Sequence, residues 1–124
     1  VPMSTAQNTT YSMIVAQLLD GRRKEQGLNQ GDFFARAGIS QSSWSRINRG
    51  VSHFTLEEMR PACRVIGVEM TEILADADKA TELLPLKEDI HILENLKGSE
   101  NKSLVPTIIA GAALGYLIFR LLKK

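Results

Sequence analysis

Four glycines divide the first part of the chain into short segments, and this punctuation limits the fold more than any other feature. Gly27, Gly38, Gly50 and Gly67 follow short runs in which apolar residues recur at helical spacing. Glycine ends helices because it adopts left-handed backbone at little cost. No alternating apolar and polar pattern of useful length predicts a strand. Residues 10–77 are therefore expected to form an all-α bundle of five short helices.

Local signals define these helices. Ser40 is a good N-cap, and Thr55 with Glu58 forms the Thr-x-x-Glu pattern of a capping box. Pro61 predicts a kink or a late start in the fourth helix. The apolar positions of the five expected helices are Ile14, Val15, Leu18 and Leu19 in one stripe; Phe33, Phe34 and Ala37; Trp44 and Ile47; Leu56, Met59, Cys63 and Ile66; and a fifth run over residues 71–77.

Residues 27–50 have the layout of a helix-turn-helix. Two short helices meet at Gly38, and Ile39 supplies an apolar side chain to the turn. Trp44 and Ile47 would pack the second helix onto the first. The residues left on its outer face are polar or basic: Gln41, Ser42, Ser45, Arg46 and Arg49. Such a face suits a helix that lies in the major groove of DNA.

Four ordered motifs extend this pattern: Gly27-Leu-Asn-Gln30, Ala37-Gly-Ile-Ser40, Ser45-Arg-Ile-Asn-Arg-Gly50, and Thr55-Leu-Glu-Glu-Met59 running on to Ile66-Gly-Val68. Over about residues 15–74 the chain thus resembles the phage-repressor and Cro-like, or Xre-type, helix-turn-helix family. The resemblance implies a five-helix lambda-repressor-like bundle that binds double-stranded operator DNA, usually as a symmetric homodimer. It also implies a role in transcription regulation, typically as a repressor.

The resemblance assigns roles by position. The base-reading positions of the recognition helix fall on Gln41, Ser42 and Arg46. Arginine can grip guanine O6 and N7 with both arms, and glutamine can pair with adenine N6 and N7. The phosphate-contacting positions fall on Gln30, Ser45, Arg49, Ser52 and His53. Phosphate contacts fix the register of the protein on DNA, and base contacts select the sequence.

Two positions depart from the family pattern. Many relatives carry glutamate at the position of Asn48, paired with a basic residue at the position of Arg23. Asparagine offers no charge, so Arg23 is expected to become available for a phosphate. Relatives usually carry alanine at the position of Phe34. The larger ring predicts a wider helix crossing or a different rotamer.

Residues 78–97 are expected to form a separate helical stalk. Leu83, Leu86, Ile90 and Leu93 match heptad a and d positions for under two heptads, which predicts a dimerisation segment. Residues 98–103 then form a flexible polar linker.

Residues 104–122 predict a hydrophobic C-terminal helix. Leu104 to Phe119 contains no charged side chain, and a helix over residues 104–122 would span about 28 Å, close to the hydrocarbon core of a bilayer. Tyr116 and Arg120 suit the lipid interface, and Gly111-x-x-x-Gly115 allows two helices to pair. We therefore expect a single-pass attachment to membrane lipid at the inner face of the cell membrane. The alternatives are a helix buried in an oligomer and an amphipathic helix that lies on the membrane surface, although the apolar residues between Ile108 and Phe119 leave no polar side for the latter.

Other functional classes find little support. The chain has one cysteine, Cys63, on an apolar helical stripe, and its spacing from His53 and His91 fits no metal motif. No paired carboxylates, nucleophile with a base, or phosphate-cradling loop predicts an enzyme or a cofactor. No signal peptide is recognised, so a cytoplasmic location is expected. The competing hypothesis is a soluble, antitoxin-like assembly protein whose C-terminal helix is buried in an oligomer or partner.

Overall fold

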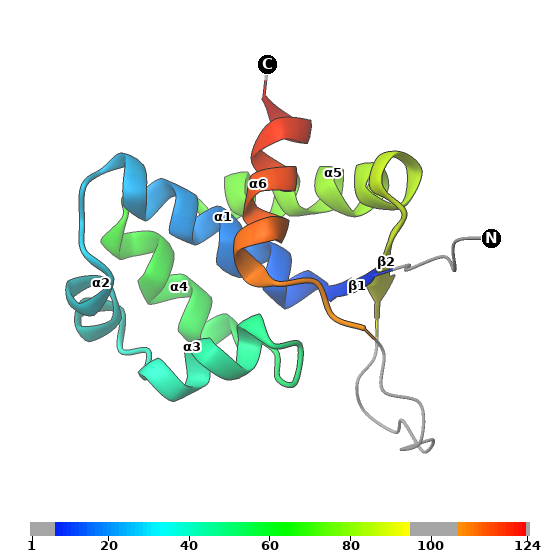
Figure 1. Ribbon diagram of the computed structural model, residues 1–124. Helices are drawn as coiled ribbons and strands as arrows, with labels where there is room; N and C mark the ends of the chain where they lie inside the picture. The colour runs from blue at the N-terminus through cyan, green and yellow to red at the C-terminus, as the bar shows by residue number, and fades with distance from the viewer. Residues whose placement is uncertain (1–6, 95–106, 124) are drawn as a thin grey trace.

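The computed structural model describes residues 7–94 and 107–123 of the chain. In chain order the elements are β1 (Gln7–Thr10), α1 (Tyr11–Glu25), α2 (Gln30–Ala37), α3 (Gln41–Asn48), α4 (Leu56–Val65), α5 (Met70–Glu88), β2 (Ile90–Leu93) and α6 (Gly111–Leu122). Figure 1 shows α2, α3 and α4 around one end of α1, and α5 and α6 around its other end. The five-helix bundle predicted for residues 10–77 is present in α1 to α5.

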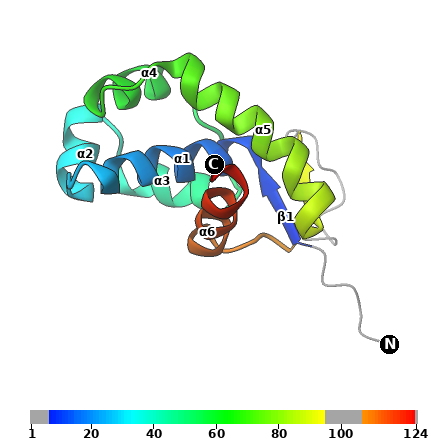
Figure 2. The ribbon, with the colours of Figure 1, turned by 90° about the horizontal axis from the view of Figure 1, so that it is seen from above.

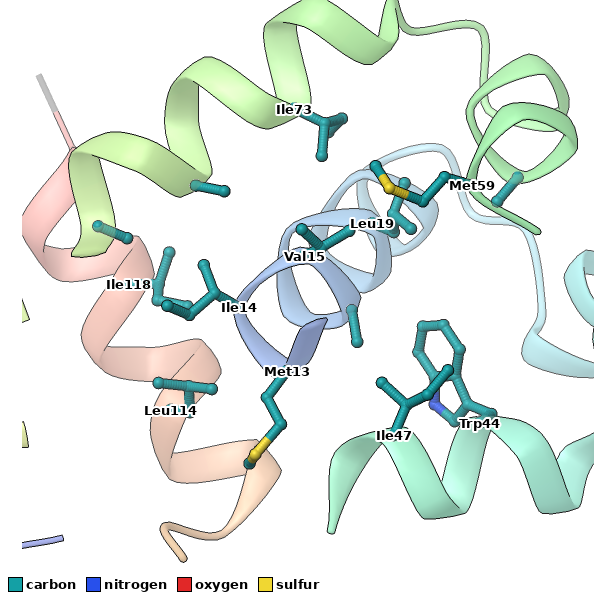
Figure 3. Packing of buried hydrophobic residues seen from close by; sticks show 14 of the residues in the cluster. Met13, Ile14, Val15, Leu19, Trp44, Ile47, Met59, Ile73, Leu114 and Ile118 are labelled. Carbon is teal, nitrogen blue, oxygen red and sulfur yellow. The ribbon is translucent and has the colours of Figure 1, made fainter. Parts of the chain in front are cut away.

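Helix α1 lies at the centre of the core. Thr10 caps it by accepting a hydrogen bond from the Met13 backbone N–H at 3.0 Å. Met13, Ile14 and Val15 are buried at successive positions, so α1 is covered on more than one side. Figure 3 shows Ile14 directed toward α6, and Trp44 and Ile47 of α3 on another side of the helix. The single buried stripe predicted for this helix is therefore too narrow.

Helices α2 to α4 follow the predicted signals closely. Gly38 ends α2 with a φ of 73°, and Ile39 is buried in the turn. Thr55 and Glu58 form the capping box at the start of α4. For Pro61 the prediction was a kink or a late start; α4 begins at Leu56 and runs through Pro61, which excludes the late start.

The separate helical stalk predicted for residues 78–97 is wrong over residues 78–94, and residues 95–97 lie outside the described residues. Helix α5 continues without a break from the predicted fifth helix to Glu88, with Pro85 inside it. Asp89 then takes a left-handed φ of 54°, which ends the helix. The heptad pattern crosses this boundary: Leu86 is 81% exposed on α5, while Ile90 is buried in β2. No single helix presents the four predicted dimer residues on one face.

Two short strands correct the all-α expectation. β1 pairs with β2 in parallel, with Gln7 opposite Ile90 and Thr10 opposite Leu93. Asn8 also bonds to the segment before α6, donating to the Thr107 carbonyl at 2.7 Å and accepting from the Ile109 N–H at 2.9 Å. These backbone bonds hold the start of α1 close to the start of α6. The predicted linker, residues 98–103, lies outside the described residues.

Helix α6 differs most from its prediction. It covers Gly111–Leu122; residues 107–110, which the prediction also made helical, lie before it, and residues 104–106 lie outside the described residues. Leu114 and Ile118 are buried against α1 and α5. Figure 3 shows Ile118 beside Ile14, and Leu114 on the side of α6 that faces α1. The burial of each of these side chains contributes about 1.5–3 kcal/mol to the free energy of unfolding. The apolar residues that predicted a bilayer helix therefore stabilise the domain itself. Within residues 7–94 and 107–123, none of the helices has the length and apolar character that a membrane span needs.

The residues predicted for helix pairing and lipid contact have partners in their own chain. A Cβ on Gly111 would lie 3.1 Å from Gln17 Nε2, and one on Gly115 would lie 2.6 Å from Gln17 Oε1. The two glycines therefore permit close packing of α6 on α1. Arg120 pairs with Glu88 of α5, and this carboxylate raises the pKa of the arginine. The Arg120 guanidinium also lies 5.8 Å from the centre of the Tyr116 ring.

Candidate nucleic-acid interface

Helix α3 presents a polar outer face on an apolar support. Ser40 caps it by accepting from the Ser43 N–H at 3.0 Å. Trp44 and Ile47 are buried beneath it. The predicted contact residues on α3 and at its end, Gln41, Ser42, Ser45, Arg46 and Arg49, are all exposed. From Gln41 to Arg49 the chain carries no acidic side chain, so nothing on this helix opposes a phosphate.

An aromatic cluster packs against the buried side of α3. The Trp44 ring lies 5.2 Å from Phe34, 6.0 Å from Phe33 and 6.0 Å from Phe54. Such tilted and edge-to-face pairs are worth about 0.5–1.5 kcal/mol each beyond their buried area. Phe34, the departure from the family pattern, is buried between α2 and α3 as part of this cluster. Its ring stabilises the helix pair directly.

Asn48 links α3 to α1. It accepts a hydrogen bond from Gln17 Nε2 at 2.8 Å and donates to the Trp44 carbonyl at 3.1 Å. The residues that form this link are 31 positions apart, so no local sequence signal marks Gln17 as the partner of Asn48. A neutral pair of side chains thus links the end of α3 to the central helix α1.

Arg23 is not released by Asn48, contrary to the prediction. Its Nε bonds to Asp20 at 2.8 Å, its Nη1 donates to the Leu28 carbonyl at 2.8 Å, and its side chain is only 12% exposed. The guanidinium therefore joins α1 to the loop before α2. This position leaves it little access to a phosphate.

The other predicted phosphate residues lie at the two ends of the helix pair. Gln30 is the first residue of α2, and Ser52 and His53 lie in the loop after α3. This loop is held by Ser12 Oγ, which accepts from the Phe54 N–H at 2.9 Å and lies 3.4 Å from His53 Nδ1. Ser12 is 41 residues from His53, and the sequence gives no sign of this contact. His53 itself stays exposed.

Cys63 is buried in α4, and burial raises the pKa of its thiol. The interpretation of this residue as a small core side chain is thus confirmed. In the described ranges, His, Cys, Asp and Glu side chains form no group of three or more that could hold a metal ion.

The comparisons with known proteins agree with this geometry. Residues 21–73 match the model of a family described as "Helix-turn-helix". The matched segment runs from the middle of α1 into α5 and contains α2, α3 and α4 whole. The searches of curated proteins and of solved structures return no match.

Two short helices joined by a tight turn, with an exposed polar face on the second, are the arrangement found in helix-turn-helix DNA-binding proteins. The match of residues 21–73 to the helix-turn-helix family model supports the phage-repressor and Cro-like type that the sequence motifs indicate. The domain is that of a DNA-binding transcriptional regulator.

Proposed function

We propose that this protein recognises a specific operator sequence through α3 and regulates transcription there. The observation that carries the proposal is the exposed, acid-free face of α3 fixed on the aromatic cluster. Gln41, Ser42 and Arg46 are the proposed base contacts. These three side chains are exposed on a helix whose opposite side is buried against the aromatic cluster, as direct readout in the major groove requires.

The proposed phosphate contacts surround this face. Gln30 stands at the start of α2, and Ser45, Arg49, Ser52 and His53 lie on α3 or in the loop that follows it. The positive charge of Arg49 and the hydroxyl groups would fix the register of α3 without selecting bases. We omit Arg23 from this set because Asp20 and the Leu28 carbonyl occupy its guanidinium.

We further propose that the protein acts as a homodimer on two half-sites. A single recognition helix contacts only a few base pairs, so the family places two such helices about one DNA turn apart. The predicted stripe that starts at Leu83 supports no such dimer, since it is divided between α5 and β2. The proposed dimer must therefore form through a different surface. A DNA-binding role also favours a cytoplasmic location, and we propose no membrane tether.

Two variants test the base readout. Arg46 extends from α3 with only a 3.4 Å contact to Ser43 Oγ. Arg46→Ala is expected to cost about 1–3 kcal/mol on the true operator and to relax the preference at one base position. Arg49→Ala is the matched control, because loss of a phosphate contact should weaken all sequences alike and lower the salt dependence.

The operator can be obtained by selection from random duplexes, and affinity measured by fluorescence anisotropy over a range of salt. Equal losses on operator and random DNA for Arg46→Ala would remove this arginine from the base-reading set. An absence of any selected sequence would remove the proposed function.

The burial of α6 restricts the alternative, an antitoxin-like assembly protein. Leu114 and Ile118 of α6 are buried in their own chain, so they are not available to an oligomer or partner. Only the outer side of α6 could serve such a role. Pull-down of a stable protein partner that blocks operator binding would favour this alternative.

A further inference from the structure

The C-terminal end of α3 contacts a segment from the far end of the chain. A Cβ on Gly111 would lie 3.4 Å from Asn48 Oδ1, so the first residue of α6 packs directly on the last residue of α3. Ile108 covers the turn after α3, since its Cδ1 would lie 3.3 Å from a Cβ on Gly50, which is buried. Figure 2 looks nearly along α6 and shows α1 and α3 beside it. Residues 108–111 therefore pack against the point at which the recognition helix ends.

The side-chain amide of Gln17 lies between α6 and α3. Its Nε2 donates to Asn48 Oδ1 at 2.8 Å. Two glycines of α6, one turn apart, face the same amide: a Cβ on Gly111 would lie 3.1 Å from Nε2, and one on Gly115 would lie 2.6 Å from Oε1. Because the backbone of α6 closes over the amide, Gln17 has little room to turn away from Asn48.

Asn48 passes this constraint to the last turn of α3. Its Nδ2 donates to the Trp44 carbonyl at 3.1 Å, and Arg46, a proposed base contact, lies on the same turn. Hydrogen bonds weaken steeply when their length or angle departs from the optimum, whereas the attraction between opposite charges changes slowly with distance. A small change in the tilt of α3 would therefore weaken the base contacts more than the phosphate contacts.

The C-terminal segment has a fixed position that does not depend on α3. Backbone bonds join Asn8 to Thr107 and Ile109, and Leu114 is buried in the core against the central helix. The start of α6 is thus held from both sides. It can therefore serve as a support against which the end of α3 is placed.

These contacts lie outside the segment that matches the helix-turn-helix family. Gln17 precedes residues 21–73, and α6 follows them. The pair that relatives form at the positions of Arg23 and Asn48 is replaced here, because Arg23 bonds to Asp20. The side-chain hydrogen bond that holds the end of α3 to α1 thus comes from a residue that the family match does not include.

We propose that residues 107–115 set the orientation of the recognition helix and that Gln17 is the positioning residue through which they act. Operator affinity then depends on side chains that are not among the proposed DNA contacts. This inference deepens the regulator proposed above and rests on its readout of operator DNA by α3. A purely structural role for the same contacts would change the stability of the domain and leave the affinity of the folded protein unchanged.

Gln17→Met is the first test, because methionine has nearly the length of glutamine and carries no hydrogen-bond donor. Gln26→Met is the matched control, since Gln26 also links α1 to another helix, donating to the Ile66 carbonyl at the end of α4. The operator Kd is measured where circular dichroism shows both variants folded. Gln17→Met should raise it about fivefold, the factor that one neutral hydrogen bond supports, with a smaller change on random DNA. Gln26→Met should leave it unchanged, and equal Kd values for the two variants would overturn the proposal.

A double-mutant cycle separates one shared hydrogen bond from two independent effects. Asn48→Leu removes the other partner with little change in volume and should weaken operator binding at least as much as Gln17→Met. The double variant should lose no more affinity than Asn48→Leu alone, because the same bond cannot be lost twice. Additive losses would overturn the role of Gln17.

The C-terminal segment is tested at Ile108. Ile108→Ala removes the side chain that packs on Gly50 and should weaken operator binding about threefold, within the range of coupling through packed side chains. Ile92→Ala is its control, since Ile92 is a half-buried isoleucine of β2, as Ile108 is of the segment before α6. It should lower Tm without changing the operator Kd. The same Kd for both alanine variants would show that residues 107–115 only stabilise the domain.

A measurement without DNA makes the two proposals separable. In amide hydrogen exchange followed by NMR, Gln17→Met should accelerate exchange at Arg49 and Gly50 more than at the amides of α2. The N–H groups of these two residues bond to the Ser45 and Ile47 carbonyls at the end of α3. If no operator is selected but this acceleration is found, the proposed function fails while α3 is still held through Gln17. Unchanged exchange, or accelerated exchange with a wild-type operator Kd, would overturn the positioning role.

Discussion

Leu114→Ala tests whether α6 is part of the folded domain. Leu114 is fully buried on the side of α6 that faces the central helix α1. Its truncation removes the transfer free energy of the lost methyl groups and leaves a cavity, since α1 is held by α3 and α5 on its other sides. We expect the free energy of unfolding to fall by about 3 kcal/mol. For a domain of this size that corresponds to a fall in Tm of roughly 10 °C.

Urea denaturation followed by two probes measures this effect. Circular dichroism reports on all helices, and fluorescence reports on Trp44, the one tryptophan of the chain. Trp44 lies on α3, away from α6, so coincident shifts of both probes would show one cooperative unit. Leu86→Ala is the control and should change stability by less than about 0.5 kcal/mol, because Leu86 is exposed. Equal midpoints for the two variants would refute the packing of α6 described above.

Three further variants examine local contacts. Gly115→Leu should lower Tm, because its Cβ would lie 2.6 Å from Gln17 Oε1, whereas a glycine that served only to pair helices in a membrane would leave the Tm of the domain unchanged. Burial and the Asp78 carboxylate raise the pKa of Tyr11 to about 12. Its contribution to stability is therefore present below the ordinary tyrosine pKa near 10 and is lost as pH rises from there through 12. Tyr11→Phe should remove that part of the alkaline stability profile, and an unchanged profile would contradict the assignment. Arg23→Ala should reduce Tm, because it removes the bonds to Asp20 and the Leu28 carbonyl, and it should leave the salt dependence of DNA binding unchanged. A weaker salt dependence at unchanged Tm would instead show that Arg23 contacts a phosphate, as the sequence predicted.

The sequence determined the helix-turn-helix because its signals are local. Gly38 with Ile39 forms the turn, Ser40 caps α3, and Thr55 with Glu58 caps α4, each through bonds within a few residues. Helical spacing also separated the buried Trp44 and Ile47 from the polar outer face. Such short-range contacts can be recognised in any chain that carries them.

Tertiary structure decided the rest, because it depends on residues far apart. β1 and β2 are four residues each, too short for a periodic signal, and each forms only because the other lies beside it. Arg23 was predicted to be available for a phosphate because Asn48 carries no charge, but in the folded chain Arg23 bonds to Asp20 and Asn48 bonds to Gln17. The apolar composition of the C-terminal segment likewise predicted that it is buried, but not whether a bilayer, an oligomer or its own domain buries it. Leu114 and Ile118 lie in the core of their own domain because the bonds of Asn8 to residues 107 and 109 bring α6 to α1.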